Sequence, residues 1–376
     1  MSLSVAPVAS KEDREAFVRL PWRIYAGDPN WVPPLLFLER RRFSPRHNAF
    51  YQHADVQLFL ARRNGEVAGR ISAQVDDEHN RFHHERTGFF GFFESDDDPE
   101  VAGALLGAAE QWLRERGMER VRGPLSFSIN EEAGLLVDGF DSPPVILMPY
   151  GRPFYPQLIE GRGYAKAQDL FAWRYDWSRI PARAQRIVDE LRGAPEVKVR
   201  IVDMKRLDQE VRTLLDIYND AWSENWGFVP ATRMEAQRMA RDLRLIADPQ
   251  IISVIEVDGE AAAVALAIPN LNQALRDLDG RLFPLGFVKL LWRVKVRGLK
   301  SGRVMLLGVK KKYRSRRYAG LAYLLCDELY LRGKERGYQW AEFSWTLEDN
   351  RLINAMIKNI NGLHYKTYRI YEKALR

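Results

Sequence analysis

The chain has 376 residues, of which 46% are hydrophobic and 28% are charged. This length predicts two domains, and the hydrophobic content excludes a largely disordered protein. The single cysteine, Cys326, excludes an intrachain disulfide and a cysteine-rich metal site, and it favours a reducing compartment. No run of about 18 apolar residues occurs, and the first residues lack the apolar stretch of a signal peptide. We therefore expect a cytoplasmic protein that does not span a membrane.

The positive charge is concentrated in one segment. Between Arg281 and Arg317 there are thirteen Lys or Arg residues and no Asp or Glu. Because the whole chain carries +7 and this segment carries +13, the remaining residues together carry −6. Such a local field suits a phosphate-bearing ligand or an anionic membrane surface. The acidic remainder would repel nucleic acid, so no nucleic-acid partner is expected.

The first half of the chain is predicted to be mostly β-structure around one helix. The Asn64-Gly65 pair between two apolar runs is a strong hairpin signal. We predict three strands at Val56–Ala61, Val67–Ala73 and Thr87–Phe93, followed by an acidic turn at Glu94–Glu100 and a helix at 101–113. Two more strands are predicted at Arg120–Leu125 and Leu170–Trp177. The basic run Arg40–Arg46 is interpreted as solvated surface.

The second half repeats this order after a connecting helix at 178–197. A second hairpin surrounds Asp258-Gly259, and an insert at 270–302 separates it from the third strand. The predicted elements are helices at 207–222 and 233–246, strands at 251–257, 261–267 and 304–309, a basic loop, a helix, a strand at 340–346, a helix at 351–360 and a strand at 365–374. The repetition indicates two copies of one mixed α/β fold, each a twisted mixed sheet flanked by helices, over 1–178 and 179–376.

The basic loop carries a recognisable motif. Arg317-Tyr-Ala-Gly320-Leu-Ala322 fits the arginine-x-x-glycine-x-(glycine or alanine) loop of the GNAT acyltransferase superfamily, which the chain resembles. In that loop, backbone N–H groups at the start of a helix hold the pyrophosphate of acyl-CoA, and a small residue lets them approach it. A second register of the motif begins at Arg314, and the choice between the two registers stays open.

The resemblance implies an acyl-CoA co-substrate, no metal, and a defined set of binding residues. They are Leu307, Gly308, Val309, Arg314, Arg316, Arg317, Tyr318, Ala319, Gly320, Leu321, Ala322 and Asn350. GNAT proteins often have an asparagine at the position of Asn350. In that pattern, its side chain contacts the pantetheine arm of the cofactor or orients a neighbouring group. Its alternative role is to cap the following helix.

The catalytic residues are less clearly indicated. Many GNAT enzymes use a tyrosine to protonate the departing thiolate, and its position here is Ile357. Tyr365 could replace it, or the thiolate could leave without an acid. Glu342 is the nearest candidate general base, with a structural ion pair as the alternative. The candidate catalytic residues are therefore Glu342, Asn350 and Tyr365.

The two halves differ at the loop. The first half has Glu94-Ser-Asp-Asp-Asp-Pro99-Glu100, whose acids would repel a pyrophosphate and whose proline lacks a donor. We therefore assign acyl-CoA to the second half and interpret the first as a degenerate GNAT-like partner. Asn130-Glu131-Glu132 could supply a carboxylate for the acceptor, with a solvated loop as the alternative.

Nearly the whole chain resembles a bacterial subgroup of double-GNAT proteins that includes bacterial ceramide synthases. The segments that carry this resemblance are His53–Ala61, Gly139–Pro144, Trp222–Pro230, Gly280–Pro284, Tyr313-Arg314 and Tyr365–Glu372. The resemblance implies transfer of a fatty acyl group from acyl-CoA to a sphingoid-base amine, in sphingolipid and ceramide synthesis. The alternatives are an acetyltransferase for a small soluble amine and a non-catalytic module that binds acyl-CoA or membranes.

The insert favours a lipophilic acceptor. Phe287, Leu290, Leu291 and Val294 follow helical spacing, and Lys289, Arg293 and Arg297 are predicted on another face. This pattern is typical of a basic amphipathic helix at a membrane interface, with packing on the core as the alternative. We expect residues 281–303 to attach the protein peripherally to an anionic inner-membrane surface.

Overall fold

The computed structural model describes residues 2–177, 180–244 and 247–375, and the chain forms two compact units. The first unit comprises Met1–Leu170, Leu275–Gly286 and Lys366–Arg376, and the second comprises Phe171–Ala274 and Phe287–Tyr365. Two residues of each predicted helix at 178–197 and 233–246 lie outside the described part. Within the described ranges, no helix is long and apolar enough to cross a membrane.

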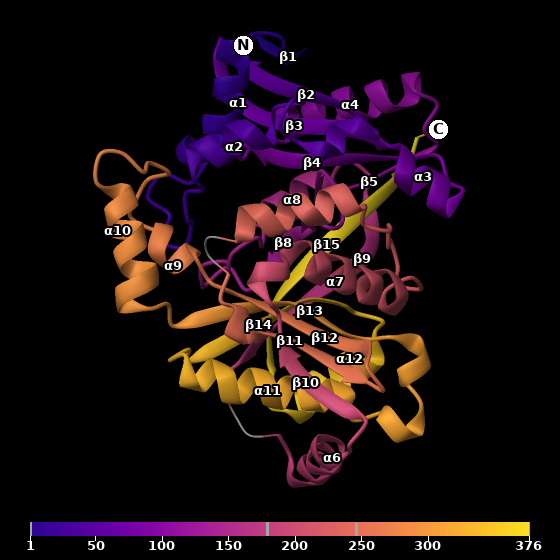
Figure 1. The fold of residues 1–376 in the computed structure, drawn as a ribbon. Coiled ribbons are helices and arrows are strands. Elements are labelled where there is room, and N and C mark those ends of the chain that lie inside the picture. Colours follow the sequence, from indigo (N-terminus) through magenta and orange to yellow (C-terminus); the bar gives the residue numbers. More distant parts are fainter. Residues whose placement is uncertain (1, 178–179, 245–246, 376) are drawn as a thin grey trace. The chain divides into compact units, whose positions relative to one another are not determined.

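The first unit is an α/β sandwich (Figure 1). Its strands are β1 (Leu3–Pro7), β2 (Ala54–Arg63), β3 (Glu66–Asp76), β4 (Thr87–Ser95), β5 (Arg120–Gly123), β6 (Leu125–Ser126), β7 (Glu132–Ala133) and β8 (Leu135–Asp138). Its helices are α1 (Lys11–Ile24), α2 (Leu36–Arg42), α3 (Asp77–His83), α4 (Pro99–Glu115) and α5 (Tyr155–Glu160). Strands β1 to β4 pair antiparallel in chain order, and β4 pairs parallel with β5.

Both faces of this sheet are covered by helices because the β2 strand is apolar on both sides. Phe59 packs with Leu105 of α4, whereas its neighbours Leu58 and Leu60 pack with Phe17 of α1. Since successive side chains of a strand point to opposite faces, α1 and α4 cover opposite faces of the sheet. This burial is the main stabilisation of the unit.

The second unit repeats the plan. Its strands are β10 (Val197–Ile201), β11 (Ile252–Val257), β12 (Glu260–Pro269), β13 (Ser301–Val309) and β14 (Trp340–Leu347). Its helices are α6 (Ala182–Gly193), α7 (Leu207–Ala221), α8 (Arg233–Leu243), α10 (Gly286–Trp292), α11 (Leu321–Glu335) and α12 (Arg351–Asn359), with the short α9 (Asn272–Leu275) at its border. Strands β10 to β13 pair antiparallel, and β13 pairs parallel with β14.

Helices also cover this second sheet. Ile217 of α7 packs against Val254 and Val264, while α11 packs on β11, β12 and β13. Figure 1 shows α11 between α6 and the strands. The predicted order of hairpin, third strand, helix, strand, helix and strand therefore occurs in both units, as expected of a mixed α/β tandem fold.

Two long strands contribute residues to both units. They are β9 (Ala165–Tyr175) and β15 (Leu363–Ala374), each divided by the border between units. In the first unit, the C-terminal part of β15 pairs antiparallel with β5, from Tyr371 opposite Gly123 to Ala374 opposite Arg120. The strand that ends the chain thus completes the sheet of the first unit.

Candidate active site

The second unit contains an opening between two parallel strands. Strands β13 and β14 pair from Ser301 opposite Trp340 to Val304 opposite Phe343, and the register ends there although both strands continue. We call the region between Met305–Val309 and Ser344–Leu347 the β13–β14 opening. Met305, Leu306 and Leu307 are half-buried, so this edge of β13 is accessible.

A bulge in β13 lies at the start of the opening. Leu306 lies opposite Leu266 of β12, but Val304 lies opposite Ala267, so Met305 is an extra residue. A bulge bends its strand and disturbs the regular pairing. In an antiparallel pair, alternate residues direct their N–H groups away from the partner strand, here toward the opening. The predicted binding residues Leu307, Gly308 and Val309 belong to this stretch.

Polar side chains tie the strands together where they separate. The buried Arg303 of β13 donates from Nε to Ser344 Oγ at 2.9 Å, just beyond the last paired residue of β14. Farther along β14, Thr346 Oγ1 accepts from Trp173 Nε1 at 2.8 Å and donates to Asn354 Oδ1 of α12 at 2.6 Å. These bonds hold β14 and α12 in position and rigidify one wall of the opening.

Two of the three predicted catalytic residues are in contact. The Tyr365 hydroxyl donates a hydrogen bond to Glu342 Oε2. Glu342 is fully buried, whereas Tyr365 is only half-buried, so the hydroxyl is the more accessible end of the pair. Ile357, at the usual position of the acid, is fully buried and apolar.

Asn350 caps the helix that follows it. Its side chain accepts a hydrogen bond from the backbone N–H of Ile353 at 3.4 Å, at the start of α12. This is the alternative role expected from the sequence. An Oδ1 engaged with the helix still leaves the amide nitrogen as a donor, so a contact of Asn350 with acyl-CoA stays a prediction.

Carboxylates that are distant in sequence form ion pairs with the basic loop after β13. Lys311 contacts Glu224 at 2.8 Å, and Lys312 contacts Glu260. Lys312 holds the pKa of Glu260 below its usual value, and Lys311 does the same for the pKa of Glu224. Lys311 and Lys312 therefore already have counter-charges within the unit.

The arginines of the motif have partners of their own. Arg314 donates to the carbonyl oxygens of Val309 and Ala221, so it fastens the loop to β13 and α7. Arg317 pairs with Glu196 but is 70% exposed, which leaves it accessible to a ligand. The side chain of Arg316 lies outside the described part of the chain. Tyr318 and Ala319 complete the turn before α11.

The helix after the loop begins without a side-chain cap. Gly320 is the N-cap residue of α11, and the first helical residues are Leu321 and Ala322. The first N–H groups of a helix have no partner within it and favour an anion. A Cβ on Gly320 would come 2.3 Å from Ile187 and 2.9 Å from Leu191 of α6. Glycine is thus favoured here by the close packing of α6.

A second glycine lets a tryptophan approach β13 closely. A Cβ on Gly308 would lie 2.3 Å from the indole of Trp222, at the end of α7. Tyr218 stacks on the same indole with ring centroids 5.3 Å apart. The predicted binding residue Gly308 therefore lies directly under an aromatic pair, at the wall of the β13–β14 opening.

The first unit has a different arrangement at the corresponding place. Glu94 and Ser95 belong to β4 and are buried, so the predicted acidic turn is shorter than Glu94–Glu100. Glu94 accepts hydrogen bonds from Tyr25 at 2.8 Å and Tyr155 at 2.7 Å, and burial raises the pKa of its carboxyl. At the start of α4, Asp98 already accepts from the N–H groups of Glu100 and Val101.

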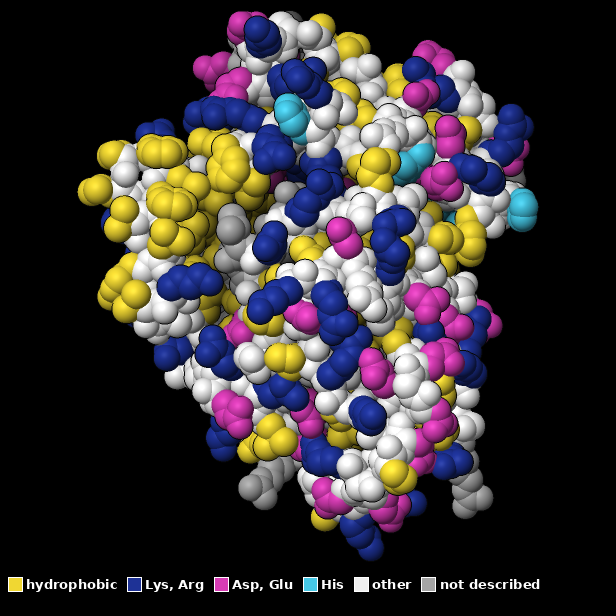
Figure 2. Space-filling view, in the orientation of Figure 1, with side chains coloured by type: hydrophobic (Ala, Val, Ile, Leu, Met, Phe, Trp, Pro, Cys, Tyr) yellow, Lys and Arg dark blue, Asp and Glu magenta, His cyan; other side chains and the backbone are white. Residues whose placement is uncertain are grey.

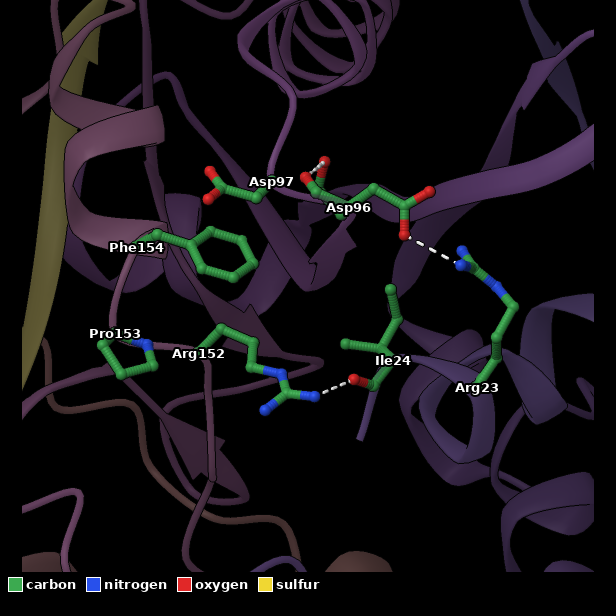
Figure 3. Close-up of a pocket in the computed structure, with 8 residues that line it drawn as sticks. Arg23, Ile24, Asp96, Asp97, Arg152, Pro153 and Phe154 are labelled. Carbon is green, nitrogen blue, oxygen red and sulfur yellow. Dashed lines mark hydrogen bonds and ion pairs between the residues drawn. The ribbon is translucent and has the colours of Figure 1, made fainter. Parts of the chain in front are cut away.

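A cavity of about 460 Å³ lies beside this turn (Figure 3). Asp96 and Asp97 lie along one side, and Asp96 is paired with Arg23 at 2.9 Å. Arg152 points to the carbonyl oxygen of Ile24. With two carboxylates lining it and both arginines engaged, this cavity does not suit a pyrophosphate.

In the first unit, another segment of the chain occupies the space beside β4 where its pairing with β5 ends. The β4–β5 register ends at Phe89 opposite Arg122. Beyond it, a Cβ on Gly91 would lie 2.0 Å from the carbonyl oxygen of Leu125, and Gln74 donates to the carbonyls of Leu125 and Phe127. The segment Leu125–Phe127 thus lies against β4 where its pairing with β5 has ended.

Several structural contacts were not indicated by the sequence. Arg42 belongs to the run interpreted as solvated surface, but it is largely buried, with its guanidinium 4.8 Å from the centroid of Phe92. It pairs with Glu131 at 3.3 Å and Glu132 at 3.2 Å. Although burial would lower the pKa of Arg42, Glu132 and Glu131 outweigh that effect and raise it. That interpretation was therefore wrong for Arg42, and the two glutamates are engaged with it.

The only cysteine is not a plausible nucleophile. Cys326 is fully buried in α11, and this burial raises the pKa of its thiol to about 12. A thiol with this pKa is almost entirely protonated at neutral pH. Acyl transfer through a cysteine thioester is therefore disfavoured.

Comparison with known sequences gives two long matches. No family model matches the chain. The chain is 47% identical over 377 residues to bacterial ceramide synthase of Caulobacter vibrioides (strain NA1000 / CB15N), covering 99% of this chain and 98% of that protein. It is also 40% identical over 370 residues to protein YghO of Escherichia coli (strain K12), covering 97% and 94%.

Solved structures with a similar fold include a tandem GNAT protein and a GCN5-related N-acetyltransferase. A tandem GNAT protein from the clavulanic acid biosynthesis pathway matches with a TM-score of 0.56 and 13% identity, over 100% of this chain and 99% of that one. A GCN5-related N-acetyltransferase from Sphaerobacter thermophilus matches with a TM-score of 0.53 and 13% identity, over 100% and 96%. These matches confirm the predicted fold. The chain therefore belongs to the family of bacterial ceramide synthase and is an acyltransferase with a tandem GNAT fold.

Proposed function

We propose that the chain transfers a long-chain acyl group from acyl-CoA to the amine of a lipophilic acceptor such as a sphingoid base. The observation that carries this proposal is the β13–β14 opening. Its strand β13 leads through the basic loop to the start of α11, and its strand β14 carries Glu342, which accepts a hydrogen bond from Tyr365. The name of the relative that is 47% identical supports the choice of acceptor.

Acyl-CoA would be held mainly by backbone groups. The loop lysines and Arg314 are already engaged, so the N–H groups of Gly320, Leu321 and Ala322 would bind the pyrophosphate, with the exposed Arg317 beside them. The N–H groups of Leu307 and Val309, which alternate with those directed to β12, would polarise the thioester carbonyl.

The Tyr365–Glu342 pair would move one proton. The neutral amine attacks the thioester carbon, and a C–N bond forms as the carbonyl becomes an oxyanion. Tyr365 takes a proton from the attacking nitrogen while its own proton passes to Glu342. When the C–S bond breaks, the proton returns through Tyr365 to the thiolate. The products are an amide and CoA, and the pair ends in its starting state.

The hydrogen bond from Tyr365 supports this order of transfer. Because Glu342 has no exposed surface, an amine would reach its carboxylate through the half-exposed hydroxyl. The arrangement also supplies an acid for the thiolate despite the isoleucine at position 357. Asn350 would contact the pantetheine arm only through the donor that its capping bond leaves available.

We assign acyl-CoA to the second unit alone and interpret the first as a degenerate GNAT domain. The start of α4 is capped by Asp98, and Leu125–Phe127 fill the space beside β4. The proposal also includes peripheral attachment to an anionic inner-membrane surface through 281–303, because a lipophilic amine resides in a bilayer.

The direct test combines purified full-length protein, palmitoyl-CoA and a sphingoid base. We expect an amide, detected by mass spectrometry, and one equivalent of free CoA thiol for each amide formed. Acetyl-CoA and a soluble primary amine serve as parallel substrates, and Tyr365→Phe serves as the control for chemistry at this site. Formation of amide from acetyl-CoA alone, or no amide and no thiol, would overturn the proposal.

A further inference from the structure

The insert before β13 carries a cluster of exposed apolar side chains. In α10 and the turn after it, Val288 is 63% exposed, Trp292 52% and Val296 71%, and Phe287 and Leu291 are also exposed. Figure 2 shows hydrophobic side chains gathered over α10 and the adjoining segment. We call these side chains the insert patch.

The patch follows a helical stripe that differs from the predicted one. The residues at 287–289, 291, 292 and 295–297 are exposed, whereas Leu290, Arg293 and Val294 are half-buried. Arg293 donates to the carbonyl oxygen of Ala274 at 2.8 Å, so it anchors the helix to the protein. The predicted basic face of Lys289, Arg293 and Arg297 is therefore divided, because Lys289 and Arg297 are exposed and Arg293 is turned to the protein. The outward face is mostly apolar.

We propose that the insert patch penetrates the interfacial region of an anionic bilayer, with its apolar side chains providing most of the affinity. This deepens the membrane attachment in the proposed function but does not depend on acyl transfer. Contiguous exposed apolar surface of this kind marks an interaction site, and aromatic side chains favour the membrane–water interface.

The charges around the patch favour a lipid surface as its occupant. Lys289, Lys295 and Arg297 are exposed, and no carboxylate of the described residues lies within ion-pair distance of any of them. Anionic headgroups would supply their counter-charges. A second copy of the chain is disfavoured, because self-association through this patch would bring together two segments that each contain cations and no acid.

The test is co-sedimentation of the full chain with vesicles, without acyl-CoA. Vesicles of phosphatidylcholine and phosphatidylglycerol are compared with vesicles of phosphatidylcholine alone. The triple variant Phe287→Ser/Trp292→Ser/Val296→Ser should lower the partition coefficient about tenfold or more. The control Phe82→Ser/Met234→Ser/Leu331→Ser, which alters exposed apolar residues on three other helices, should bind like the unaltered protein.

Two further measurements separate insertion from adsorption by charge and from self-association. Brominated lipid chains should quench tryptophan emission less in Trp292→Phe than in the unaltered protein. Binding could instead disappear at high salt and be equally strong in the patch variant and the unaltered protein. That result would show adsorption by charge alone and would overturn insertion. A lipid-free dimer that the patch variant converts to a monomer would overturn it in favour of self-association.

Failure of this inference is distinguishable from failure of the proposed function. If both hold, the patch variant retains amide formation on acceptor dissolved in detergent and loses it on acceptor in vesicles. If the patch variant is folded but loses activity on the detergent-dissolved acceptor, the patch takes part in acyl transfer itself, and its independence from the active site is overturned. Vesicle binding without any amide formation would overturn the acyltransfer proposal and leave the membrane-insertion proposal standing.

Discussion

The hydroxyl of Tyr365 donates a hydrogen bond to the carboxylate of Glu342, and only the tyrosine has exposed surface. Glu342 lies on β14 one residue before the pairing with β13 ends, and Tyr365 lies at the beginning of β15. Two residues from separate strands thus form one polar unit at the side of the β13–β14 opening. In the proposed mechanism, neither residue moves the proton without the other.

The first prediction concerns this pair. Tyr365→Phe removes the hydroxyl and keeps the ring, so kcat should fall about 10²- to 10³-fold with little change in KM. Glu342→Gln should have an effect of similar size. Because the residues act as a unit, the double variant should be no worse than the worse single variant. Steady-state release of CoA thiol, measured over a range of pH, checks these values.

Additive losses in the double variant would contradict the relay and assign separate roles to the two residues.

Asn350→Ala provides a comparison, because the observed contact of Asn350 is a helix cap. If that is its only role, this variant should cost about 1 kcal/mol of stability and leave kcat unchanged. A large loss in kcat would establish a contact with acyl-CoA.

The second prediction concerns Gly308. A methyl group at this position would lie 2.3 Å from the Trp222 ring, so Gly308→Ala should displace the indole and cost about 1–3 kcal/mol of stability. Because the indole covers the wall of the opening, the preference among acyl-chain lengths should change as well. Urea unfolding and a series of acyl-CoA donors measure the two effects.

The double variant Gly308→Ala/Trp222→Leu supplies the control for this prediction. Leucine is shorter than tryptophan and leaves room for the new methyl group, so the double variant should recover stability relative to Gly308→Ala. If both variants retain the chain-length preference of the unaltered protein, Trp222 has no part in selecting the acyl group.

The sequence predicted local structure well because the signals for it are local. Asn64-Gly65 and Asp258-Gly259 have positive φ angles, as a tight hairpin turn requires, and both predicted hairpins are present. The alternation between apolar runs and helical spacing indicated the repeated order of elements. The edge strands β1 and β10 were missed, since short strands at sheet edges carry little apolar pattern.

The contacts that define the site depend on residues distant in sequence. The loop lysines appeared available for a phosphate, but Glu224 and Glu260 compensate two of them from other elements. The closeness of Gly308 to Trp222 arises from how α7 packs on β13. Likewise, the spacing of the insert indicated an amphipathic helix, but the direction of Arg293 depends on the carbonyl of Ala274. Such pairings are set by tertiary packing, which the pattern of one segment does not determine.

The third prediction contrasts two arginines of the loop. Arg314 bonds to the carbonyls of Val309 and Ala221, so Arg314→Ala should loosen the loop, cost about 1–2 kcal/mol and raise KM for acyl-CoA. Arg317→Ala leaves those bonds intact and removes one exposed cation, so KM should rise without loss of stability. Thermal unfolding and binding of CoA by calorimetry distinguish the two effects. Equal changes in stability would contradict the structural role of Arg314.

The last prediction uses His79 of α3 in the first unit. Burial lowers the pKa of His79 to about 4, below the value of about 6.5 expected in an unfolded chain. Between these two pH values the unfolded chain binds the extra proton, so this contribution to stability is complete above pH about 6.5. It is lost progressively as the pH falls to about 4, and it amounts to about 3 kcal/mol at most.

His79→Gln removes the titrating group and keeps a polar side chain of similar length. The variant should be less stable than the unaltered protein at pH about 7, because the ring packs against Phe89 with centroids 4.8 Å apart. Its stability should nevertheless decline less steeply between pH about 6.5 and 4. Thermal unfolding across this range, followed by calorimetry so that the two units can be resolved, measures both slopes. Parallel slopes for the two proteins would show that other groups cause the acid sensitivity of this unit.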